Sequence, residues 1–327
     1  MVYLCGKGVT MTAKKTLDAG LAKAEDLREA GDSAGARAAL EALADEPALA
    51  ALPPVTALGL NRRLHAGFLR LAKRSGDRVA RAGLQMLLVP PPDVLSALTE
   101  VTTPDRREIA QANARPVPRV LHQVWIGNLS VPPGCAAWQA HARAQGYAYH
   151  LWRETEIATL GLSDGVFRAR LAAGDYPGAV DAARYAILAR YGGIYLDCDW
   201  YPARSDIGFH DVLPMTGLIA MAEEIPRLTG KGPLLLANSF IAVPPAHPVM
   251  VRLQEILPLA EQAIPAAPAW WTTGPLIFTL VARGGSLTLA DAALVARTLP
   301  RAAPFAEVQR AMEDARDGGM LIGWKSW

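Results

Sequence analysis

Cysteine is scarce in this 327-residue chain: Cys5, Cys135 and Cys198 form no CxxC pair and no even-numbered set. This excludes a disulfide framework and predicts a reducing, cytoplasmic compartment. The chain also lacks an uncharged apolar run of about 18 residues, so no transmembrane helix is expected. A peripheral position at the inner face of a membrane is the alternative.

An excess of charge of one sign is also missing, because 33 Lys and Arg stand against 31 Asp and Glu, for a net charge of +2. This balance gives no reason to expect nucleic acid or an anionic membrane as a partner. The six histidines are scattered without zinc-ligand spacing. Hydrophobic residues make up 51% of the chain, which is typical of a globular protein with a large core.

The sequence changes character near residue 113. Residues 1–112 are rich in Ala, Leu, Arg and Glu at helical spacing, with prolines between the runs, and predict an all-helical N-terminal module of roughly four to five helices. Gly-Asp turns at Gly31-Asp32 and Gly76-Asp77 give it a weak likeness to tetratricopeptide hairpins. Their offset, however, is longer than the expected period of about 34 residues.

Residues 113–327 alternate between strand-like and helix-like segments. The expected strands are 119–126, 147–152, 193–196, 218–222 and 240–243, and the expected helices are 178–191 and 248–263. This alternation predicts an α/β domain with a mostly parallel sheet and with ligands at the carboxyl ends of its strands.

The most informative segment is DAARYAILARYGGIYLDCD, residues 181–199. A helix here places Asp181 and Arg184 one turn apart on the same face. Gly192-Gly193 ends that helix and permits a tight turn into a short apolar strand. The strand ends in Asp197 and Asp199, which alternation predicts on one face of the sheet, with the intervening cysteine on the other.

Two carboxylates this close repel each other unless a cation lies beside them. Oxygen ligands suit Mg²⁺ or Mn²⁺, which then bridges to a diphosphate. Such an ion neutralises the charge of a departing nucleoside diphosphate, and Arg184 supplies a second positive charge. An isolated Asp-x-Asp more often begins a solvated loop. The preceding apolar strand, the Gly-Gly turn and the upstream Asp-x-x-Arg favour the metal–diphosphate site.

The Asp181/Arg184 pair, the run YGGIYLDCD at 191–199 and the upstream strand LHQVWIG at 121–127 resemble a known family. They look like the DxD-containing sugar transferases related to yeast initiating α-1,6-mannosyltransferase (glycosyltransferase family 32-like, including capsular polysaccharide types). They are also similar to the glucosyltransferase domain of large clostridial toxins. The resemblance covers residues 116–327, so we expect a glycosyltransferase domain at 113–327.

This resemblance implies a Rossmann-like GT-A fold and the transfer of a hexose, with retention of configuration, from a nucleotide-diphospho-sugar in the presence of Mn²⁺ or Mg²⁺. A UDP-hexose is the favoured donor, and GDP-mannose is the alternative. The acceptor is expected to be a hydroxyl of a glycan or a protein, in a setting such as polysaccharide biosynthesis.

The resemblance also assigns roles to particular residues. It implies that Trp125 stacks on the base and that Tyr195 lies near the phosphates or the sugar. Asp181 and Arg184 hold the donor sugar and stabilise the leaving phosphate, and Asn238 brings an amide to the transferred sugar. For the metal, the implied residues are Asp199 as the ligand and Asp197 beside it, in contact with ribose and sugar hydroxyls.

The C-terminus departs from the family pattern. Relatives often carry a histidine that approaches the metal shortly before a terminal Ser-Trp, whereas this chain ends GWKSW without it. Ser326 and Trp327 could still close over the diphosphate, and Lys325 could neutralise it. The number of protein ligands to the metal is therefore open.

Two other functions are compatible with parts of the sequence. A haloacid-dehalogenase-type phosphatase also ends an apolar strand in Asp-x-Asp, with the first Asp as nucleophile. Its motif usually comes early in the domain and is followed by Thr or Val rather than by the Trp200-Tyr201 of this chain. A non-catalytic nucleotide-sugar-binding protein is the other alternative. The helical module is expected to complete the catalytic domain's surface, with recruitment of a protein partner or dimerisation as the alternative.

Overall fold

The computed structural model describes residues 5–50, 52–56, 58–87, 91–162, 165–265, 267–315 and 319–327, without the side chains of residues 5–10 and 50. The chain forms two compact units. The first is Met1–Val94 with Glu224–Leu234, and the second is Leu95–Glu223 with Leu235–Trp327. Helix α6 (Thr103–Ala112), which falls within the range predicted for the helical module, lies in the second unit.

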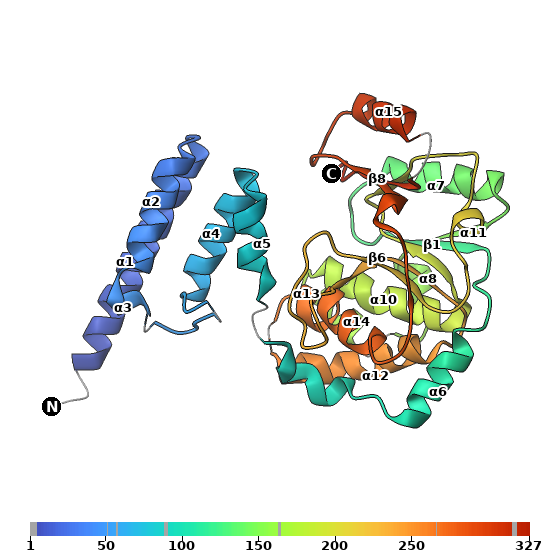
Figure 1. Cartoon of the computed structure of the whole chain (residues 1–327), viewed down its shortest axis with the longest axis horizontal. Coiled ribbons are helices and arrows are strands. Elements are labelled where there is room, and N and C mark those ends of the chain that lie inside the picture. Colours follow the sequence, from blue (N-terminus) through green and yellow to red (C-terminus); the bar gives the residue numbers. More distant parts are fainter. Residues whose placement is uncertain are drawn as a thin grey trace. The chain divides into compact units, whose positions relative to one another are not determined.

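Helices dominate the described part of the first unit (Figure 1). They are α1 (Cys5–Glu29), α2 (Ser33–Ala44), α3 (Pro47–Ala50), α4 (Arg62–Arg74) and α5 (Arg78–Met86). The two Gly-Asp turns are helix starts: Asp32 accepts a hydrogen bond from Gly35 N at 2.8 Å, and Asp77 one from Ala80 N at 2.9 Å. Buried leucines of α1, α2 and α4 form the core of this unit.

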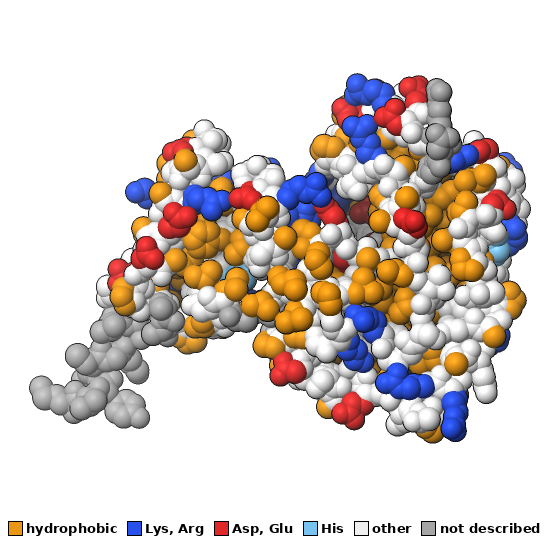
Figure 2. All heavy atoms as spheres, in the orientation of Figure 1, with side chains coloured by type: hydrophobic (Ala, Val, Ile, Leu, Met, Phe, Trp, Pro, Cys, Tyr) orange, Lys and Arg blue, Asp and Glu red, His pale blue; other side chains and the backbone are white. Residues whose placement is uncertain are grey.

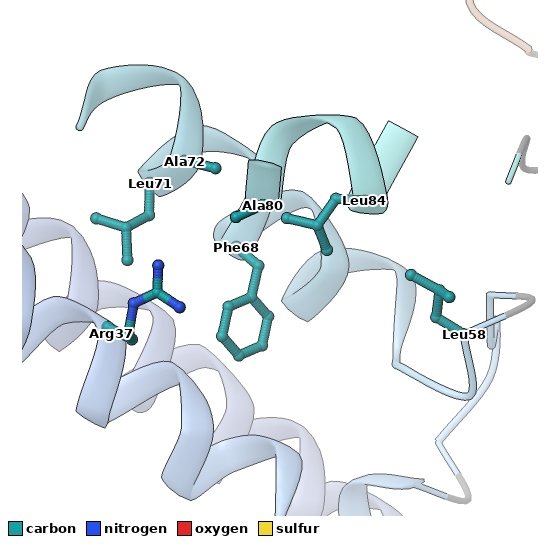
Figure 3. Close-up of a pocket in the computed structure, with 8 residues that line it drawn as sticks. Arg37, Leu58, Phe68, Leu71, Ala72, Ala80 and Leu84 are labelled. Atoms are coloured by element: carbon teal, nitrogen blue, oxygen red, sulfur yellow. The ribbon is translucent and has the colours of Figure 1, made fainter. Parts of the chain in front are cut away.

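A cavity of about 390 Å³ lies among α2, α4 and α5 (Figure 3). Its walls are mainly apolar and include Phe68, Leu71 and Leu84. The guanidinium of Arg37 at this cavity is paired with Asp77 at 3.0 Å. Its charge is thus already balanced within the unit.

Helices and strands alternate from residue 113 onward, as predicted, and two helical elements, η1 and α6, precede them. The elements are η1 (Pro92–Thr99), α6 (Thr103–Ala112), β1 (Val120–Val124), α7 (Pro133–Ala144), β2 (Ala148–Trp152), α8 (Glu154–Ala158), α9 (Val166–Ala172), α10 (Tyr176–Tyr191), β3 (Gly193–Leu196), β4 (Trp200–Pro202), α11 (Phe209–Val212), β5 (Ile219–Ala222), β6 (Leu236–Val243), α12 (Pro248–Ala263), α13 (Ala269–Thr272), α14 (Pro275–Ala282), β7 (Thr288–Leu289), η2 (Ala292–Leu294), β8 (Val295–Thr298), α15 (Phe305–Asp314) and β9 (Leu321–Gly323).

The main sheet has the strand order β2-β1-β3-β6-β5-β7. Strand β1 pairs in parallel with β2 and β3, and β5 pairs in parallel with β7, whereas β6 is antiparallel to both of its neighbours. The α/β class and the mostly parallel sheet are confirmed, with β6 as the exception. Because β1 and β3 are parallel neighbours, their carboxyl ends meet at one edge of the sheet.

Helices α10 and α14 pack against the main sheet, α10 on β1 and β3 and α14 on β6 (Figure 1). Alternate strand residues such as Leu121, Ile194 and Phe240 form a core cluster with Trp138 of α7. A second sheet, β4-β9-β8, pairs Trp200 with Gly323. This pairing brings the C-terminal segment beside the residues that follow β3.

No helix in the described residues is long and apolar enough to cross a membrane. On the face shown in Figure 2, Lys and Arg side chains are interspersed with Asp and Glu side chains. This pattern agrees with the balanced charge of the sequence.

Candidate functional site

The turn between α10 and β3 is as tight as the glycine pair predicts. Gly192 and Gly193 have φ values of 62° and 96°, in the region that favours glycine. A Cβ on Gly193 would lie 2.7 Å from Val120 O, so β3 approaches β1 too closely for any side chain there. This turn delivers the triplet Asp197-Cys198-Asp199 to the carboxyl edge of the sheet.

Arg184 is the centre of a buried network. Its Nη2 lies 3.0 Å from an oxygen of Asp181 and 3.0 Å from an oxygen of Asp197, and its Nη1 donates to the carbonyl of Asn238. Its guanidinium carbon lies 4.5 Å from the centre of the Tyr195 ring. Burial opposes the charge, but Asp197, Tyr195 and Asp181 outweigh it and raise the pKa of Arg184.

Asp181 is enclosed by hydrogen bonds. It accepts from Asn238 Nδ2 at 2.8 Å and from Thr273 Oγ1 at 2.9 Å, in addition to its pairing with Arg184. Burial raises its pKa to about 6, against the opposing effect of Arg184. In this arrangement Asp181 positions Arg184 and the Asn238 amide.

Asp197 and Asp199 differ in their surroundings. Asp197 accepts a hydrogen bond from the Tyr195 hydroxyl at 2.9 Å on the oxygen that also pairs with Arg184. Trp200 N donates to Asp197 O at 3.1 Å, so the chain turns directly after β3. The regular alternation of side chains along the strand therefore ends at Leu196, and it does not determine the side on which Asp199 lies.

Asp199 has a carboxylate that no other described residue holds by an ion pair or a side-chain hydrogen bond. Burial raises its pKa to about 6, Asp197 adds to the effect, and Lys325 opposes it. Such a carboxylate fits a single protein contact to Mg²⁺ or Mn²⁺, with the remaining ligands supplied by a diphosphate and water. Among the described residues, no group of three His, Cys, Asp or Glu side chains could hold a metal ion.

Cys198 packs into an apolar cluster with Trp125 and Cys135, and its thiol donates to Val124 O at 3.3 Å. The neighbouring Cys198 thiol lowers the pKa of the Cys135 thiol. These contacts hold the triplet against β1 and α7.

A cavity of about 550 Å³ opens at this edge of the sheet. Its lining residues are Val124, Trp125, Ile126, Gly127, Asn128, Leu129, Tyr176, Pro177, Val180, Arg184, Tyr195, Asp197, Cys198, Asp199, Lys325 and Trp327. It therefore brings together Trp125, Arg184, Tyr195, Asp197, Asp199 and Trp327 from the sequence prediction. Its volume lies within the usual range of small-molecule sites.

Three predicted residues do not line this cavity: Asp181, Asn238 and Ser326. The first two lie directly behind Arg184, because Asn238 Nδ2 bonds to Asp181 and the Asn238 carbonyl accepts from Arg184. Asn238 also lies inside β6, whereas the sequence analysis placed it before the strand.

Tyr176 and Leu129 are among the lining residues that were not predicted, and their side chains are 44% and 63% exposed. The Tyr176 ring covers Gly127, where a Cβ would come within 3.1 Å of it. An aromatic residue at the start of α10, five residues before Asp181, was the available signal.

This chain is similar to a family model, to a curated protein and to a solved structure. Residues 143–215 match the family described as glycosyltransferase sugar-binding region containing DXD motif. Over 144 residues, the chain is 28% identical to inositol phosphoceramide mannosyltransferase 1 of Schizosaccharomyces pombe. This alignment covers 42% of the chain and 41% of that relative's length. The structure of the PaToxG glycosyltransferase matches with a TM-score of 0.43 and 16% identity, over 58% of this chain and 76% of that one.

The matched family region contains Asp181, Arg184, Tyr195, Asp197 and Asp199. The resemblance to DxD-containing glycosyltransferases is thereby confirmed. The matched region includes neither Trp125 nor the C-terminal segment.

Proposed function

We propose that this chain is a metal-dependent glycosyltransferase of GT-A type that moves a hexose from a nucleotide-diphospho-sugar to an acceptor hydroxyl with retention. The observation that carries the proposal is the meeting of Arg184, Asp197, Asp199 and Trp125 in one cavity of about 550 Å³ at the carboxyl edge of the sheet. The free thiols Cys135 and Cys198 favour a cytoplasmic setting.

In this proposal the donor lies along the cavity. Trp125, whose Nε1 is fixed by donation to Leu129 O at 3.0 Å, offers its ring to the base. The buried Nε of Arg184 has no hydrogen-bond partner among the described residues. In this proposal it donates to a phosphate oxygen of the bound donor. Asp197, held by Arg184 and Tyr195, accepts from ribose or sugar hydroxyls.

Asp199 would hold a Mn²⁺ or Mg²⁺ ion, which supplies positive charge to the departing diphosphate. Asp197 stands beside it, with one oxygen already engaged by Arg184. Arg184 adds a second, fixed positive charge that needs no reorganisation during the reaction.

Retention follows from displacement on a single face of the sugar. The bond from the anomeric carbon to the phosphate oxygen breaks, and the acceptor oxygen bonds to that carbon from the same side. The acceptor's proton passes to the departing phosphate oxygen. This route needs no protein nucleophile, which suits a site whose Asp197 is ion-paired and whose Asp181 is enclosed.

A thermal-shift panel tests the proposal with UDP-glucose, UDP-galactose and GDP-mannose, each with and without Mn²⁺. A donor present at about 100 times its Kd should stabilise the protein by about 2.7 kcal/mol. We expect a UDP-hexose to give the largest rise and Mn²⁺ to be required for most of it. GDP-mannose is the alternative, in line with the name of the fission yeast relative. If none of the three donors shifts the transition with Mn²⁺ present, the proposal is wrong.

Asp199→Ala tests the metal role separately. We expect Mn²⁺-dependent donor hydrolysis to fall by roughly 100-fold or more, because the diphosphate loses its cation. Turnover near that of the wild type would remove Asp199 from this role.

A further inference from the structure

Four charged side chains line the cavity: Arg184, Asp197, Asp199 and Lys325. Arg184 lies 3.0 Å from Asp197 and 3.0 Å from Asp181, so two carboxylates already surround its guanidinium. Asp199 and Lys325 also face the cavity and interact electrostatically, but within the described part of the chain neither forms an ion pair. Lys325 is therefore a cation that the protein leaves available at the wall of the site.

The backbone fixes Lys325 beside the triplet. Trp324 N donates to Asp199 O at 2.6 Å, and Lys325 O accepts from Ala302 N at 2.8 Å. The Trp324 indole donates to Ala303 O at 2.8 Å. The C-terminal segment is thus anchored immediately before Lys325 and at Lys325 itself.

The ammonium also lies near the aromatic side chains of the site. Lys325 Nζ lies 5.4 Å from the centre of the Trp327 ring, and that ring meets Trp125 edge-on at 4.8 Å. A lysine ammonium is a compact, strongly hydrated charge with three donors, and phosphate is a usual partner for it. Among the described residues, no group of three His, Cys, Asp or Glu side chains could hold a divalent ion, so a positive side chain at the wall of the cavity would add to the charge that a phosphate-bound ion supplies.

We propose that Lys325 binds the diphosphate of the donor and supplies part of the positive charge that a divalent cation would otherwise provide. The chain should therefore retain a nucleoside diphosphate after the divalent cation has been removed. This inference rests on the proposed function, because it takes the cavity to be the site of a nucleotide-diphospho-sugar.

Calorimetry with UDP and GDP as probes tests the proposal, in EDTA and in MnCl₂. The proteins are the full-length wild type, Lys325→Met, Lys325→Arg and the control Lys14→Met, which removes an exposed lysine of α1. In EDTA we expect Lys325→Met to weaken binding of the preferred probe by about 10-fold or more, which is the loss of one charge-assisted hydrogen bond. Lys325→Arg should retain most of the affinity, and Lys14→Met should retain all of it. In MnCl₂ the difference in affinity between the wild type and Lys325→Met should be smaller than in EDTA.

The outcomes separate this inference from the proposed function. If the wild type binds a probe in EDTA and Lys325→Met binds it equally well, Lys325 has no such role. If the wild type binds only with Mn²⁺, the proposal that the chain retains a nucleotide without metal is overturned. If the wild type binds neither probe even with Mn²⁺, the proposed function itself fails. Tryptophan fluorescence of each variant checks that the second unit remains folded.

Discussion

At the residue scale, the Arg184 side chain on α10 contacts the carboxylates of Asp181 and Asp197 and a backbone carbonyl of β6. Arg184→Lys keeps the charge but loses the planar fork that reaches Asp181, Asp197 and the Asn238 carbonyl together. We expect kcat/KM for sugar transfer to fall by roughly 100-fold or more, since a single lysine nitrogen cannot hold the two carboxylates and the carbonyl together in the productive geometry. Initial rates at several donor concentrations measure the loss.

Arg190→Lys is the matched control for this substitution. Arg190 lies on the same helix, is exposed, and stands 5.4 Å from the centre of the Tyr191 ring. Its replacement should leave kcat/KM within about twofold of the wild type, as is usual for a surface position. Equal losses in the two variants would show that α10 is merely sensitive to substitution.

Asp181 gives a pH-dependent prediction about stability. Burial raises its pKa to about 6, against the opposing effect of Arg184, while in the unfolded chain it ionises near 3.8. At a pH between these two pKa values, the Asp181 carboxyl is ionised in the unfolded chain and protonated in the folded chain. Raising the pH in this range therefore favours unfolding. The stabilising contribution is full below about pH 3.8 and is lost as the pH rises through about 6.

Asp181→Asn removes this titration. From about pH 4 to pH 7 the wild type should therefore lose roughly 2–3 kcal/mol of unfolding free energy relative to the variant. Urea unfolding followed by tryptophan fluorescence at several pH values measures the difference. A difference that stays constant with pH would contradict the raised pKa.

Six of the predicted residues line the cavity. Helical spacing predicted Arg184, the end of a strand predicted Asp197 and Asp199, and the family resemblance implied Trp125, Tyr195 and Trp327. The sequence did not predict that Asp197 would be held by Arg184 and Tyr195 while Asp199 has no ion pair with any residue that the structure describes. That difference arises at the turn after Leu196, where strand alternation no longer applies. The roles of individual residues remain predictions.

At the scale of elements, the turn into β3 depends on Gly193. Gly193→Ala would place a methyl group 2.7 Å from Val120 O at a φ of 96°. We expect a loss of about 3 kcal/mol or more of unfolding free energy, since both backbone strain and overpacking act there. Urea unfolding followed by tryptophan fluorescence measures the loss.

Gly146→Ala separates the two contributions. Gly146 has a φ of 70° but open space around the position of its missing Cβ, so only the strain of about 1 kcal/mol applies. If both variants lose the same stability, the close approach of β3 to β1 contributes nothing.

Most elements of the second unit were predictable, because apolar runs bounded by Gly and Pro mark them locally. Strand β6 was not predicted in full: the sequence indicated 240–243, whereas the strand spans Leu236–Val243. Asn238 favours a turn by itself, but in the folded chain its amide is satisfied by Asp181 and by the Tyr185 hydroxyl. The antiparallel direction of β6 likewise depends on long-range pairing with β3 and β5.

At the scale of the whole molecule, the segment Glu224–Leu234 is the feature that sequence alone does not reveal. It leaves the second unit after β5 and returns to it before β6, and it belongs to the first unit. There Leu228 N donates to Met86 O at 2.7 Å, and Glu224 lies 3.6 Å from Arg81. No local pattern marks such a segment, because only contacts with residues distant in sequence define it.

This arrangement predicts that the second unit can be isolated if the segment is removed with the first unit. Ala222 pairs with Leu236, and Glu223 N donates to Leu235 O at 2.8 Å, so β5 and β6 are already in hairpin register where the segment leaves and returns. A chain of residues 95–327 with Asn-Gly in place of 224–234 should close as a two-residue hairpin. All eight tryptophans and every predicted site residue lie in this unit.

We expect this hairpin variant to show the tryptophan emission of the full-length chain. Its Kd for the preferred donor should lie within about threefold of the full-length value, a difference of less than about 1 kcal/mol in binding free energy. The same residues with 224–234 retained are the control, and should be less soluble because that segment has lost the partners it contacts in the first unit. A well-folded hairpin variant that no longer binds the donor would show that the helical unit contributes to the site.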